Sequence, residues 1–258
     1  MARSWKPMTA RTPDLSVVIP AFNEERRLAH TLPQVFSYLA ARGLRGEVIV
    51  VDDGSTDATA EVVRQFAAQY PELRLLSNPG NRGKGYSVRA GMLAATGRLA
   101  LFTDADLSAP IEEADKLLAA LADYDIAIGS RALDRSLIQQ HQPWWRERAG
   151  IAFNWATRLL SGLPFQDTQC GFKAFRREPT RILFEQQRIE RFGFDPEILF
   201  LALRHGLRVV EIPVRWAHHP DSRVHVFRDG LRMVGDLLRI RVHAALGRYP
   251  RTERGPRF

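Results

Sequence analysis

The feature that most constrains the fold is a regular alternation of short aliphatic runs with longer helical stretches. The aliphatic runs predict strands at 15–20, 47–51, 73–76, 99–103 and 126–129. Helices are predicted between them, at 24–42, 56–70, 83–96 and 110–122. The run Glu47–Val51 is almost purely aliphatic, as expected of a strand buried on both faces. This alternation indicates an α/β fold with a doubly wound, mostly parallel sheet and helices on both faces.

After residue 131 the pattern is less regular. Residues 132–146 are polar but include Trp144 and Trp145. An apolar helix is predicted at 147–161, then a strand at 171–176, a helix at 194–205 and a strand at 208–214. The last predicted element is a long amphipathic helix at 227–246. The 258 residues contain no internal repeat or low-complexity linker, which favours one large domain.

Four of the predicted strands end in charged or polar residues. The charged ones are Glu24 after the first strand, Asp52 and Asp53 after the second, Asp104 and Asp106 after the fourth, and Arg131 after the fifth; Pro20 and Phe22 precede Glu24 in the same segment. In an open α/β sheet, ligands bind at the carboxyl ends of the strands. Each motif alone also fits an ordinary turn or helix cap. The convergence of five carboxylates at one edge therefore predicts a ligand site there.

Asp104-Ala105-Asp106 is the most specific of these motifs. Two carboxylates lie two residues apart, directly after the apolar run 99–102. Oxygen ligands at an open site suit Mg²⁺ or Mn²⁺, whose remaining positions a diphosphate can fill. The segment Asn81–Gly85 contributes Lys84, which can pair with a phosphate at a helix start. It is not a Walker A loop, because its glycine spacing differs and no Ser or Thr follows Lys84.

The composition limits the partners and the compartment. Lys and Arg number 37 against 29 Asp and Glu, a net charge of +8 carried almost entirely by Arg. Arginine suits phosphate groups of small molecules, nucleic acids or anionic membranes. A cleft rich in carboxylates would repel a phosphodiester backbone, so we expect no nucleic-acid partner. One cysteine, no signal peptide and no membrane-spanning run favour a cytoplasmic protein.

The four motifs, in this order and spacing, resemble glycosyltransferase family 2, which has the GT-A fold. The resemblance covers about residues 15–131. It implies a nucleotide-sugar donor bound by Pro20, Glu24, Asp53 and Asp104, with the metal at Asp106. It also implies Ser108 as a third metal-side ligand, since some relatives supply one at that position. Phe22, Asp52 and Lys84 complete the predicted donor site.

The second half resembles the dolichyl-phosphate β-glucosyltransferases and, more distantly, the dolichyl-phosphate mannose synthases. The motifs that carry this resemblance are 166–173 (Q-D-T-Q-C-G-F-K), 194–199 (F-D-P-E-I-L) and 221–223 (D-S-R). It implies transfer of glucose from UDP-glucose, or mannose from GDP-mannose, to a polyprenyl phosphate with inversion. Asp167 would contact the sugar, Arg131 a donor or acceptor phosphate, and Arg223 the diphosphate. Asp221 departs from the relatives, which often have glycine there.

The identity of the acceptor decides whether a general base is needed. A lipid phosphate is already ionised near neutral pH and needs none. A hydroxyl acceptor on a soluble glycan or polysaccharide needs one, and Asp195 or Glu197 is then the candidate. Both acids also fit ordinary charges in the first turn of a helix that begins near Pro196. A nonenzymatic protein that binds anionic surfaces is the alternative from another class, based on the charge of +8.

Two segments could contact a membrane. The helix at 227–246 carries an apolar stripe beside a basic one, which fits either a core helix or a helix in the membrane interface. The helix at 147–161, preceded by Trp144 and Trp145, leaves the same choice. We expect peripheral attachment to the cytoplasmic face of a membrane. The predicted organisation is a basic arm (1–13), a GT-A domain (14–225) with a nucleotide-binding half (14–131) and an acceptor half (132–225), and a C-terminal amphipathic helix and tail (226–258).

Overall fold

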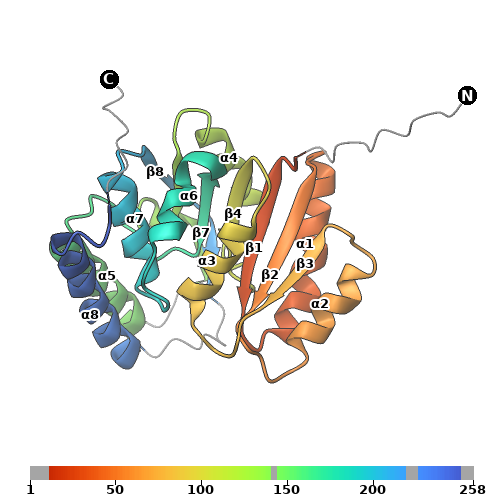
Figure 1. Ribbon diagram of the computed structural model, residues 1–258, viewed down its shortest axis with the longest axis horizontal. Coiled ribbons are helices and arrows are strands. Elements are labelled where there is room, and N and C mark those ends of the chain that lie inside the picture. Colours follow the sequence, from red (N-terminus) through yellow and green to blue (C-terminus); the bar gives the residue numbers. More distant parts are fainter. Residues whose placement is uncertain (1–11, 141–143, 219–225, 251–258) are drawn as a thin grey trace, which may run out of the picture.

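A computed structural model describes residues 12–140, 144–218 and 226–250 (Figure 1). Some side chains within 144–156 and 226–231 are not described. Its centre is a seven-stranded sheet in the order β3-β2-β1-β4-β7-β5-β8. The strands are β1 (Leu15–Ala21), β2 (Gly46–Asp52), β3 (Leu73–Ser77), β4 (Leu99–Thr103), β5 (Ile126–Ser130), β7 (Phe172–Arg176) and β8 (Val209–Pro213). Only β7 runs antiparallel to its neighbours in this sheet. The predicted mostly parallel α/β fold is confirmed.

Helices cover both faces of the sheet. One face carries α1 (Glu25–Ala41), α2 (Thr59–Ala67), the short 3₁₀ helix η1 (Ile111–Glu113) and α4 (Ala114–Ala120). The other face carries α3 (Lys84–Ala94), α6 (Arg177–Gln186) and α7 (Phe194–Arg204). Successive residues of a strand point to opposite faces, so Val17 and Ile19 pack in the first core and Val18 in the second. Apolar side chains on both faces explain why the predicted strands contained so few polar residues.

Strand β7 is buried on both faces and joins the two halves of the sheet. Phe172 and Ala174 pack in the core under α1 and α4, whereas Phe175 packs in the core under α6 and α7. Its backbone bonds to β4 on one side and to β5 on the other. The nucleotide-binding and acceptor halves inferred from the sequence therefore share one continuous sheet.

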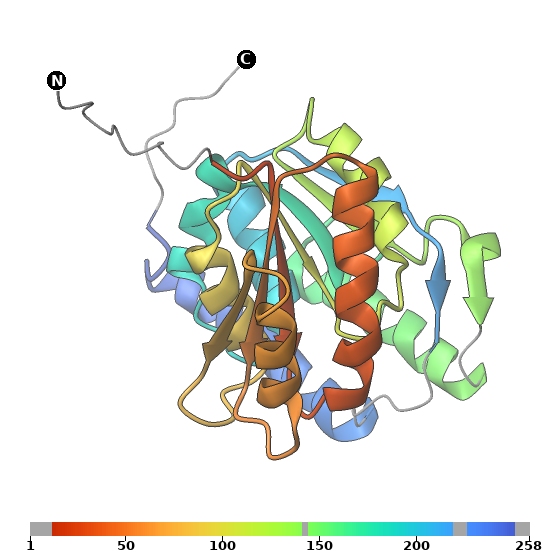
Figure 2. The ribbon, with the colours of Figure 1, turned by 90° about the vertical axis from the view of Figure 1, so that its right-hand side faces the viewer.

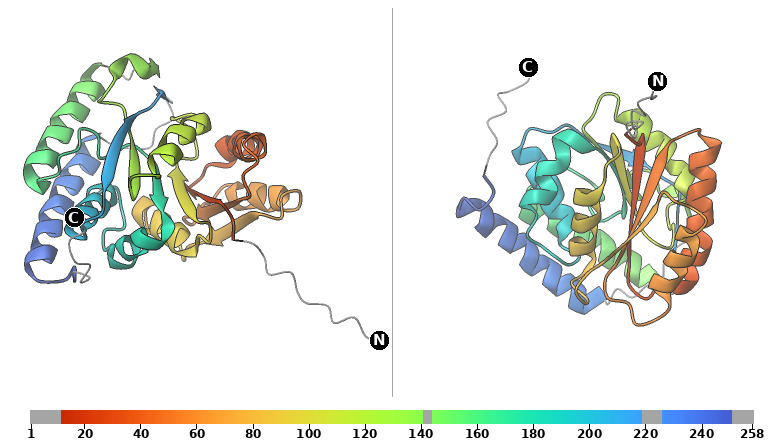
Figure 3. Two further views of the ribbon diagram at one scale, coloured as in Figure 1. Left: turned by 90° about the horizontal axis from the view of Figure 1, so that it is seen from above. Right: turned by 45° about the vertical axis from the view of Figure 1, so that its right-hand side comes forward.

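Helices α5 (Trp144–Ser161) and α8 (Val226–Ala245) lie side by side at one end of the molecule, outside α7 (Figures 1 and 3). The predicted helix at 147–161 begins three residues earlier than expected. In α8, Leu237 and Ile240 pack against the core, while Leu238 and Val242 are exposed. Two apolar residues of the predicted amphipathic helix, Leu238 and Val242, thus face away from the protein. Within the described residues, no helix is long and apolar enough to cross a bilayer.

Four short or irregular elements were not predicted. Strand β6 (Ile138–Gln140) follows the 3₁₀ helix η2 (Arg135–Leu137) and pairs in parallel with β9 (Trp216–Ala217), apart from the main sheet (Figure 2). Strands of two or three residues are too short to show a periodic pattern. Helix α6 was missed because its sequence opens with charged residues and Pro179.

Candidate active site

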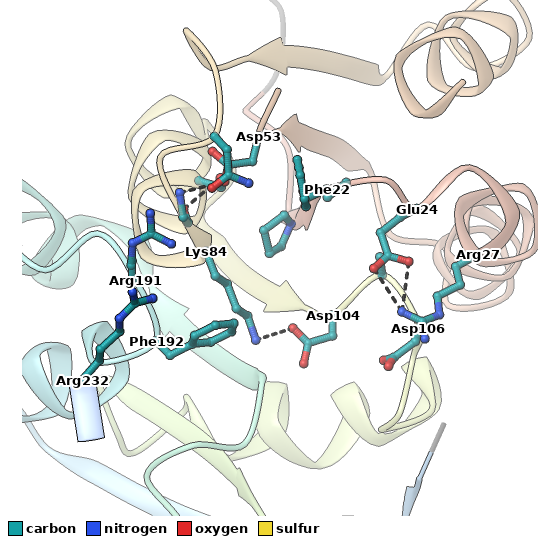
Figure 4. A pocket seen from close by; sticks show the side chains of 16 residues that line it. Phe22, Glu24, Arg27, Asp53, Lys84, Asp104, Asp106, Arg191, Phe192 and Arg232 are labelled. Carbon is teal, nitrogen blue, oxygen red and sulfur yellow. Dashed lines mark hydrogen bonds and ion pairs between the residues drawn. The ribbon is translucent and has the colours of Figure 1, made fainter. Parts of the chain in front are cut away.

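A cleft of about 430 Å³ opens at the carboxyl ends of β1, β2 and β4 (Figure 4). Small-molecule sites commonly have volumes of about 300–1,000 Å³. The cleft is lined by Pro20, Ala21, Phe22, Glu24, Arg27, Asp53, Asn81, Gly83, Lys84, Ser87, Asp104, Ala105, Asp106, Arg191, Phe192 and Arg232. Seven of the predicted donor and metal residues are among them: Pro20, Phe22, Glu24, Asp53, Lys84, Asp104 and Asp106.

Asp53 is held at the end of β2 by the segment that precedes α3. Its carboxylate accepts hydrogen bonds from Asn78 Nδ2 (2.8 Å), Arg82 N (2.9 Å) and Gly83 N (2.7 Å). The side chain is buried but still lines the cleft. Three of its lone-pair directions are therefore used within the protein, and the carboxylate reaches a ligand in one fixed orientation.

The glycines on either side of Lys84 allow a second segment to pack closely on the start of α3. A Cβ at Gly83 would lie 2.6 Å from Glu190 O, and one at Gly85 would lie 2.7 Å from Ile189 O. Gly83 also has a φ of +112°, which favours glycine. Residues 189–193 therefore pack against this turn, which brings Arg191 and Phe192 into the cleft wall. These glycines therefore allow close backbone packing, while phosphate binding by this segment stays a prediction.

Lys84 and Asp104 form an ion pair across the cleft, with Nζ 2.6 Å from Oδ1 (Figure 4). The Asp104 carboxylate rests against Gly171 at the start of β7, where an added Cβ would lie 2.1 Å from Oδ2. Burial disfavours the charge on Lys84, but Asp104, Asp195 and Asp106 outweigh it and raise the pKa of Lys84. Lys84 is therefore a cation at neutral pH, paired with a carboxylate of the D-A-D motif.

Asp106 lies in the turn after β4 and lines the cleft. Its Oδ1 accepts a hydrogen bond from Ser108 N (3.0 Å), a geometry that the left-handed backbone of Leu107 (φ +46°) permits. Asp106 and Asp104 on one turn at an open cleft fit Mg²⁺ or Mn²⁺, which take oxygen ligands and commonly keep several from outside the protein. The described residues contain no group of three or more His, Cys, Asp or Glu side chains that could enclose a metal.

Glu24 forms the opposite wall of the cleft. Both of its carboxylate oxygens accept from Arg27 Nη1, each at 3.0 Å (Figure 4). The preceding residue, Asn23, has a φ of +54°, and its side-chain oxygen accepts from Thr56 N at 2.7 Å. The loops after β1 and β2 are thereby bonded to each other, and the position of Glu24 is set by both.

Behind the cleft lies a buried ion pair between Lys173 of β7 and Asp195 of α7. Their Nζ and Oδ1 atoms are 2.5 Å apart, and Lys173 also donates to Cys170 O at 2.6 Å. Burial raises the pKa of Asp195, although Lys173 and Lys84 act in the opposite direction. Asp195 does not line the cleft, because the first turn of α7 directs it to Lys173.

Arg131 and Asp167 form a second ion pair, in which Asp167 is buried and Arg131 is partly exposed. The Arg131 guanidinium donates to Asp167 through Nε (2.6 Å) and Nη2 (2.8 Å), and its backbone N donates at 3.0 Å. Gln169 N adds a fourth hydrogen bond to the same carboxylate, at 3.2 Å. Burial opposes ionisation of Asp167, but Arg131 and these hydrogen bonds lower its pKa. The Arg131 guanidinium also lies 5.4 Å from the centre of the Trp216 ring.

Seven predicted site residues are not among those that line the cleft: Arg131, Asp167 and Asp195, described above, and Glu197, Asp52, Ser108 and Arg223. Glu197 is fully buried, and its carboxylate accepts from Arg188 N, Ile189 N and Tyr249 OH, so it cannot reach a substrate as a base. Asp52 accepts from Ser55 N within its own turn and does not line the cleft. Ser108 orients Asp106 through its backbone instead of lining the cleft. Arg223 lies outside the described residues.

The cleft also contains three arginines and a phenylalanine that the sequence did not indicate. Arg27 comes from α1, Arg191 and Phe192 from the segment before α7, and Arg232 from α8. Arg191 and Arg232 lie on the Lys84 side of the cleft, opposite Glu24 and Asp106 (Figure 4). The available signal was the pair of glycines at 83 and 85, because closely spaced glycines at a helix start often mark a close backbone approach.

Known proteins are similar to this chain in sequence and in fold. The family model for glycosyl transferase family 2 matches residues 16–184. The dolichyl-phosphate beta-glucosyltransferase of Drosophila melanogaster is 38% identical over 92% of this chain and 77% of its own length. The human protein of that name is 36% identical over 92% of this chain and 78% of its own length. That of Saccharomyces cerevisiae is 34% identical over 91% and 76%.

Solved structures match the fold at low sequence identity. Glucosyl-3-phosphoglycerate synthase from Mycobacterium tuberculosis, in complex with UDP, has a TM-score of 0.62 and 20% identity over 88% of this chain and 80% of its own. A mannosyltransferase from Pyrobaculum calidifontis, in complex with GDP-Man and Mn²⁺, has a TM-score of 0.56 and 20% identity over 93% and 72%. These neighbours share the GT-A fold. With the family match over 16–184 and relatives over about nine-tenths of the chain, this protein is a glycosyltransferase that belongs to glycosyl transferase family 2.

Proposed function

We propose that this protein transfers glucose from UDP-glucose to a polyprenyl phosphate, with inversion at the anomeric carbon. The observation that carries the proposal is the similarity of 33–38% identity, over about nine-tenths of the chain, to proteins named dolichyl-phosphate beta-glucosyltransferase. The cleft supports it, because carboxylates and cations face each other across a space of suitable size. The polyprenyl phosphate acts as the nucleophile, and UDP leaves.

The donor would bind along the carboxyl edge of the sheet. Asp53 offers a fixed acceptor to the nucleoside, and Asp104 an acceptor beside it. Asp106, with Asp104, would hold Mg²⁺ or Mn²⁺, which when bound would offset the charge of the leaving diphosphate. Lys84 can release Asp104 and pair with phosphate oxygens when the donor enters. In this proposal, Lys84 would lie beside the position where negative charge develops.

The arrangement of acids favours a phosphate over a hydroxyl as the acceptor. Of the two proposed bases, Asp195 is buried against Lys173 and Glu197 is enclosed by backbone N–H groups and Tyr249. Neither lines the cleft. A phosphate monoester is ionised near neutral pH and can attack without losing a proton. Arg131, anchored by Asp167, is the candidate to bind the acceptor phosphate.

The outer face of α5 and α8 is the proposed membrane contact. Five apolar side chains in these helices or directly after α8 are more than half exposed: Trp155, Leu159, Leu238, Val242 and Leu246. Exposed arginines flank them, at 158, 239 and 241. Arginines near an anionic leaflet contribute about 1 kcal/mol each, and inserting a half-exposed apolar side chain contributes about as much. We propose that this face holds the enzyme on the anionic cytoplasmic leaflet, beside its proposed lipid acceptor.

Transfer of radiolabel to a short polyprenyl phosphate tests the reaction. UDP-glucose and GDP-mannose are compared, with Mn²⁺ or with EDTA, using wild type, Asp106→Asn and the exposed control Asp123→Asn. Glucosyl lipid that requires the metal, disappears in Asp106→Asn and persists in Asp123→Asn supports the proposal. Mannosyl lipid would change the sugar, and no lipid product from either donor would reject a lipid acceptor.

Cosedimentation with vesicles tests the membrane contact. Leu238→Glu and Val242→Glu should weaken binding to anionic vesicles at least tenfold, because both side chains are exposed on the proposed face. Tyr124→Glu is the matched control, since Tyr124 is also exposed but follows α4. Turnover of a short acceptor in detergent should survive in all three variants. Equal vesicle binding by the wild type and all variants would place the lipid contact elsewhere.

A further inference from the structure

One cation in the wall of the cleft, Arg191, is not paired with any carboxylate of the described residues. Two other cations of the wall are paired, Lys84 with Asp104 at 2.6 Å and Arg27 with Glu24 at 3.0 Å. Arg191 is exposed and lines the cleft, yet its side chain makes no hydrogen bond or ion pair with a residue that the structure describes. An accessible guanidinium without a counter-charge is suited to bind an anionic group of a ligand.

The carboxylates beside Arg191 are bound by other arginines. Glu190, the preceding residue, accepts from Arg82 Nη2 at 2.5 Å and from Arg82 Nε at 3.3 Å. Asp236 of α8 packs against the same segment, and its Oδ1 accepts from Arg239 Nη1 at 3.0 Å. The charge of Arg191 is therefore available for a ligand in the cleft.

The segment that carries Arg191 is fixed to the start of α3. Tyr86 N donates to Glu190 O at 2.9 Å. The stem of Arg191 packs on Gly83, where an added Cβ would lie 2.9 Å from Arg191 Cγ. Arg191 is thus held beside the helix start that carries Lys84, and both lie on the same side of the cleft (Figure 4). A helix start with two adjacent cations favours a phosphate group.

Two buried residues hold the same segment from behind. The Glu197 carboxylate accepts from Arg188 N at 3.0 Å and from Ile189 N at 2.9 Å. Tyr249, which follows α8 and is fully buried, donates its hydroxyl to Glu197 at 2.6 Å. Neither Glu197 nor Tyr249 lines the cleft. They can therefore affect a ligand only by fixing the backbone that leads to Arg191.

We propose that Arg191 binds the diphosphate of the nucleotide-sugar donor, and that Glu197 and Tyr249 are its positioning residues. The inference rests on the proposed function and names a further cation of that site. In the transfer, the bond from the anomeric carbon to the diphosphate oxygen breaks, its electron pair stays on that oxygen, and a bond to an acceptor phosphate oxygen forms. Arg191 can stabilise this charge without first leaving a partner, whereas Lys84 has to leave Asp104.

Binding of UDP and of uridine, each with Mn²⁺, separates the diphosphate from the nucleoside. Arg191→Gln should weaken UDP binding at least tenfold, as expected for a lost hydrogen bond to a charged group. Uridine should bind within about twofold of wild type, and Arg191→Lys should recover part of the UDP affinity. The melting temperature of Arg191→Gln should not change, because no bond among the described residues is lost. Arg208→Gln is the control, since Arg208 is exposed at the opposite end of the sheet.

A double-mutant cycle tests the positioning role. Tyr249→Phe should weaken UDP binding about threefold in the wild-type background and have no effect in Arg191→Gln, because it acts through Arg191. A merely structural role would lower the melting temperature without making the effect on UDP depend on Arg191. Tyr38→Phe is the matched control. It also removes a hydroxyl from a buried tyrosine, bonded to Asp115 at 2.9 Å on the other face of the sheet, and should leave UDP affinity unchanged.

The outcomes separate this inference from the proposed function. Unchanged UDP affinity in Arg191→Gln, or equal weakening of UDP and uridine, overturns the assignment of Arg191 to the diphosphate. The same loss of affinity from Tyr249→Phe in both backgrounds overturns the positioning role. A wild type that binds UDP through Arg191 but forms no glucosyl lipid from UDP-glucose overturns the proposed function and leaves the role of Arg191 intact.

Discussion

Replacing Asp167 with asparagine should destabilise this protein by about 3 kcal/mol, because it breaks a buried ion pair and leaves Arg131 without its counter-charge. The Asp167 side chain is 1% exposed and that of Arg131 is 28% exposed. Asparagine offers one oxygen where aspartate offers two, and its amide N–H₂ would face N–H donors. At least one bond from the guanidinium is therefore lost together with the charge.

The magnitude follows from the burial of the pair. Removing one partner of a buried ion pair typically destabilises by about 3–5 kcal/mol. The lower end applies here, because the partly exposed Arg131 can regain some hydration. For a domain of this size, about 3 kcal/mol corresponds to a fall of roughly 6–12 °C in melting temperature. Urea denaturation should show a lower midpoint with an unchanged slope.

Asp14→Asn provides a control with the same bonding pattern. Asp14 accepts from Arg45 Nε (3.0 Å), Nη2 (2.9 Å) and backbone N (3.2 Å), but this pair is exposed. Exposed pairs contribute little to stability. The contribution of Asp167, whose pKa is lowered, should be present above about pH 4 and disappear as the pH falls through its folded pKa. Equal effects of the two substitutions near neutral pH would refute the assignment of the effect to burial.

Three further substitutions test the site. Gly171→Ala should weaken UDP binding at least tenfold, because the added Cβ would lie 2.1 Å from Asp104 Oδ2. Gly150→Ala is the control and should bind UDP normally in the same titration, because a Cβ at Gly150 would have no atom within 4 Å. Burial raises the pKa of Glu197, so its stabilising contribution is full below its unfolded pKa and declines as the pH rises through its folded pKa. Denaturation from pH 4 to 8 should therefore show wild type losing stability relative to Glu197→Gln, and a constant difference would contradict this. Tyr249→Phe removes the hydroxyl that donates to Glu197 and should therefore speed backbone hydrogen exchange in 187–193 and 247–250. Unchanged exchange would show that this hydrogen bond does not hold the two segments together.

Local chemistry explains why much of the site was predictable. Strand β4 was predicted at its observed bounds, because its five residues are apolar or Thr and polar turn residues follow. Parallel strands bring their carboxyl ends to one edge, so Asp53, Asp104 and Asp106 could be placed together without coordinates. This reasoning needs only the period of the strands and the residue after each one.

The remaining residues depend on contacts between distant segments. Arg191 and Arg232 enter the cleft from the second half of the chain, and no strand end precedes either of them. Asp195 and Glu197 lie two residues apart on α7, so they point in different directions, one to Lys173 and one to Tyr249. Sequence spacing could nominate both as bases but could not show that both are enclosed. The sugar contact of Asp167 stays a prediction, and its partner Arg131 became visible only in the fold.

The position of β7 has a consequence for the order in which this protein matures during synthesis. β7 lies between β4 and β5, yet it follows β5 in the chain by about forty residues. Until residues 172–176 emerge from the ribosome, β4 and β5 each present an open edge that awaits the same partner, and such edges favour aggregation. Gly171, which supports Asp104, arrives with that strand. The cleft at the carboxyl edge is therefore among the last features to mature, although most of its lining residues are made first.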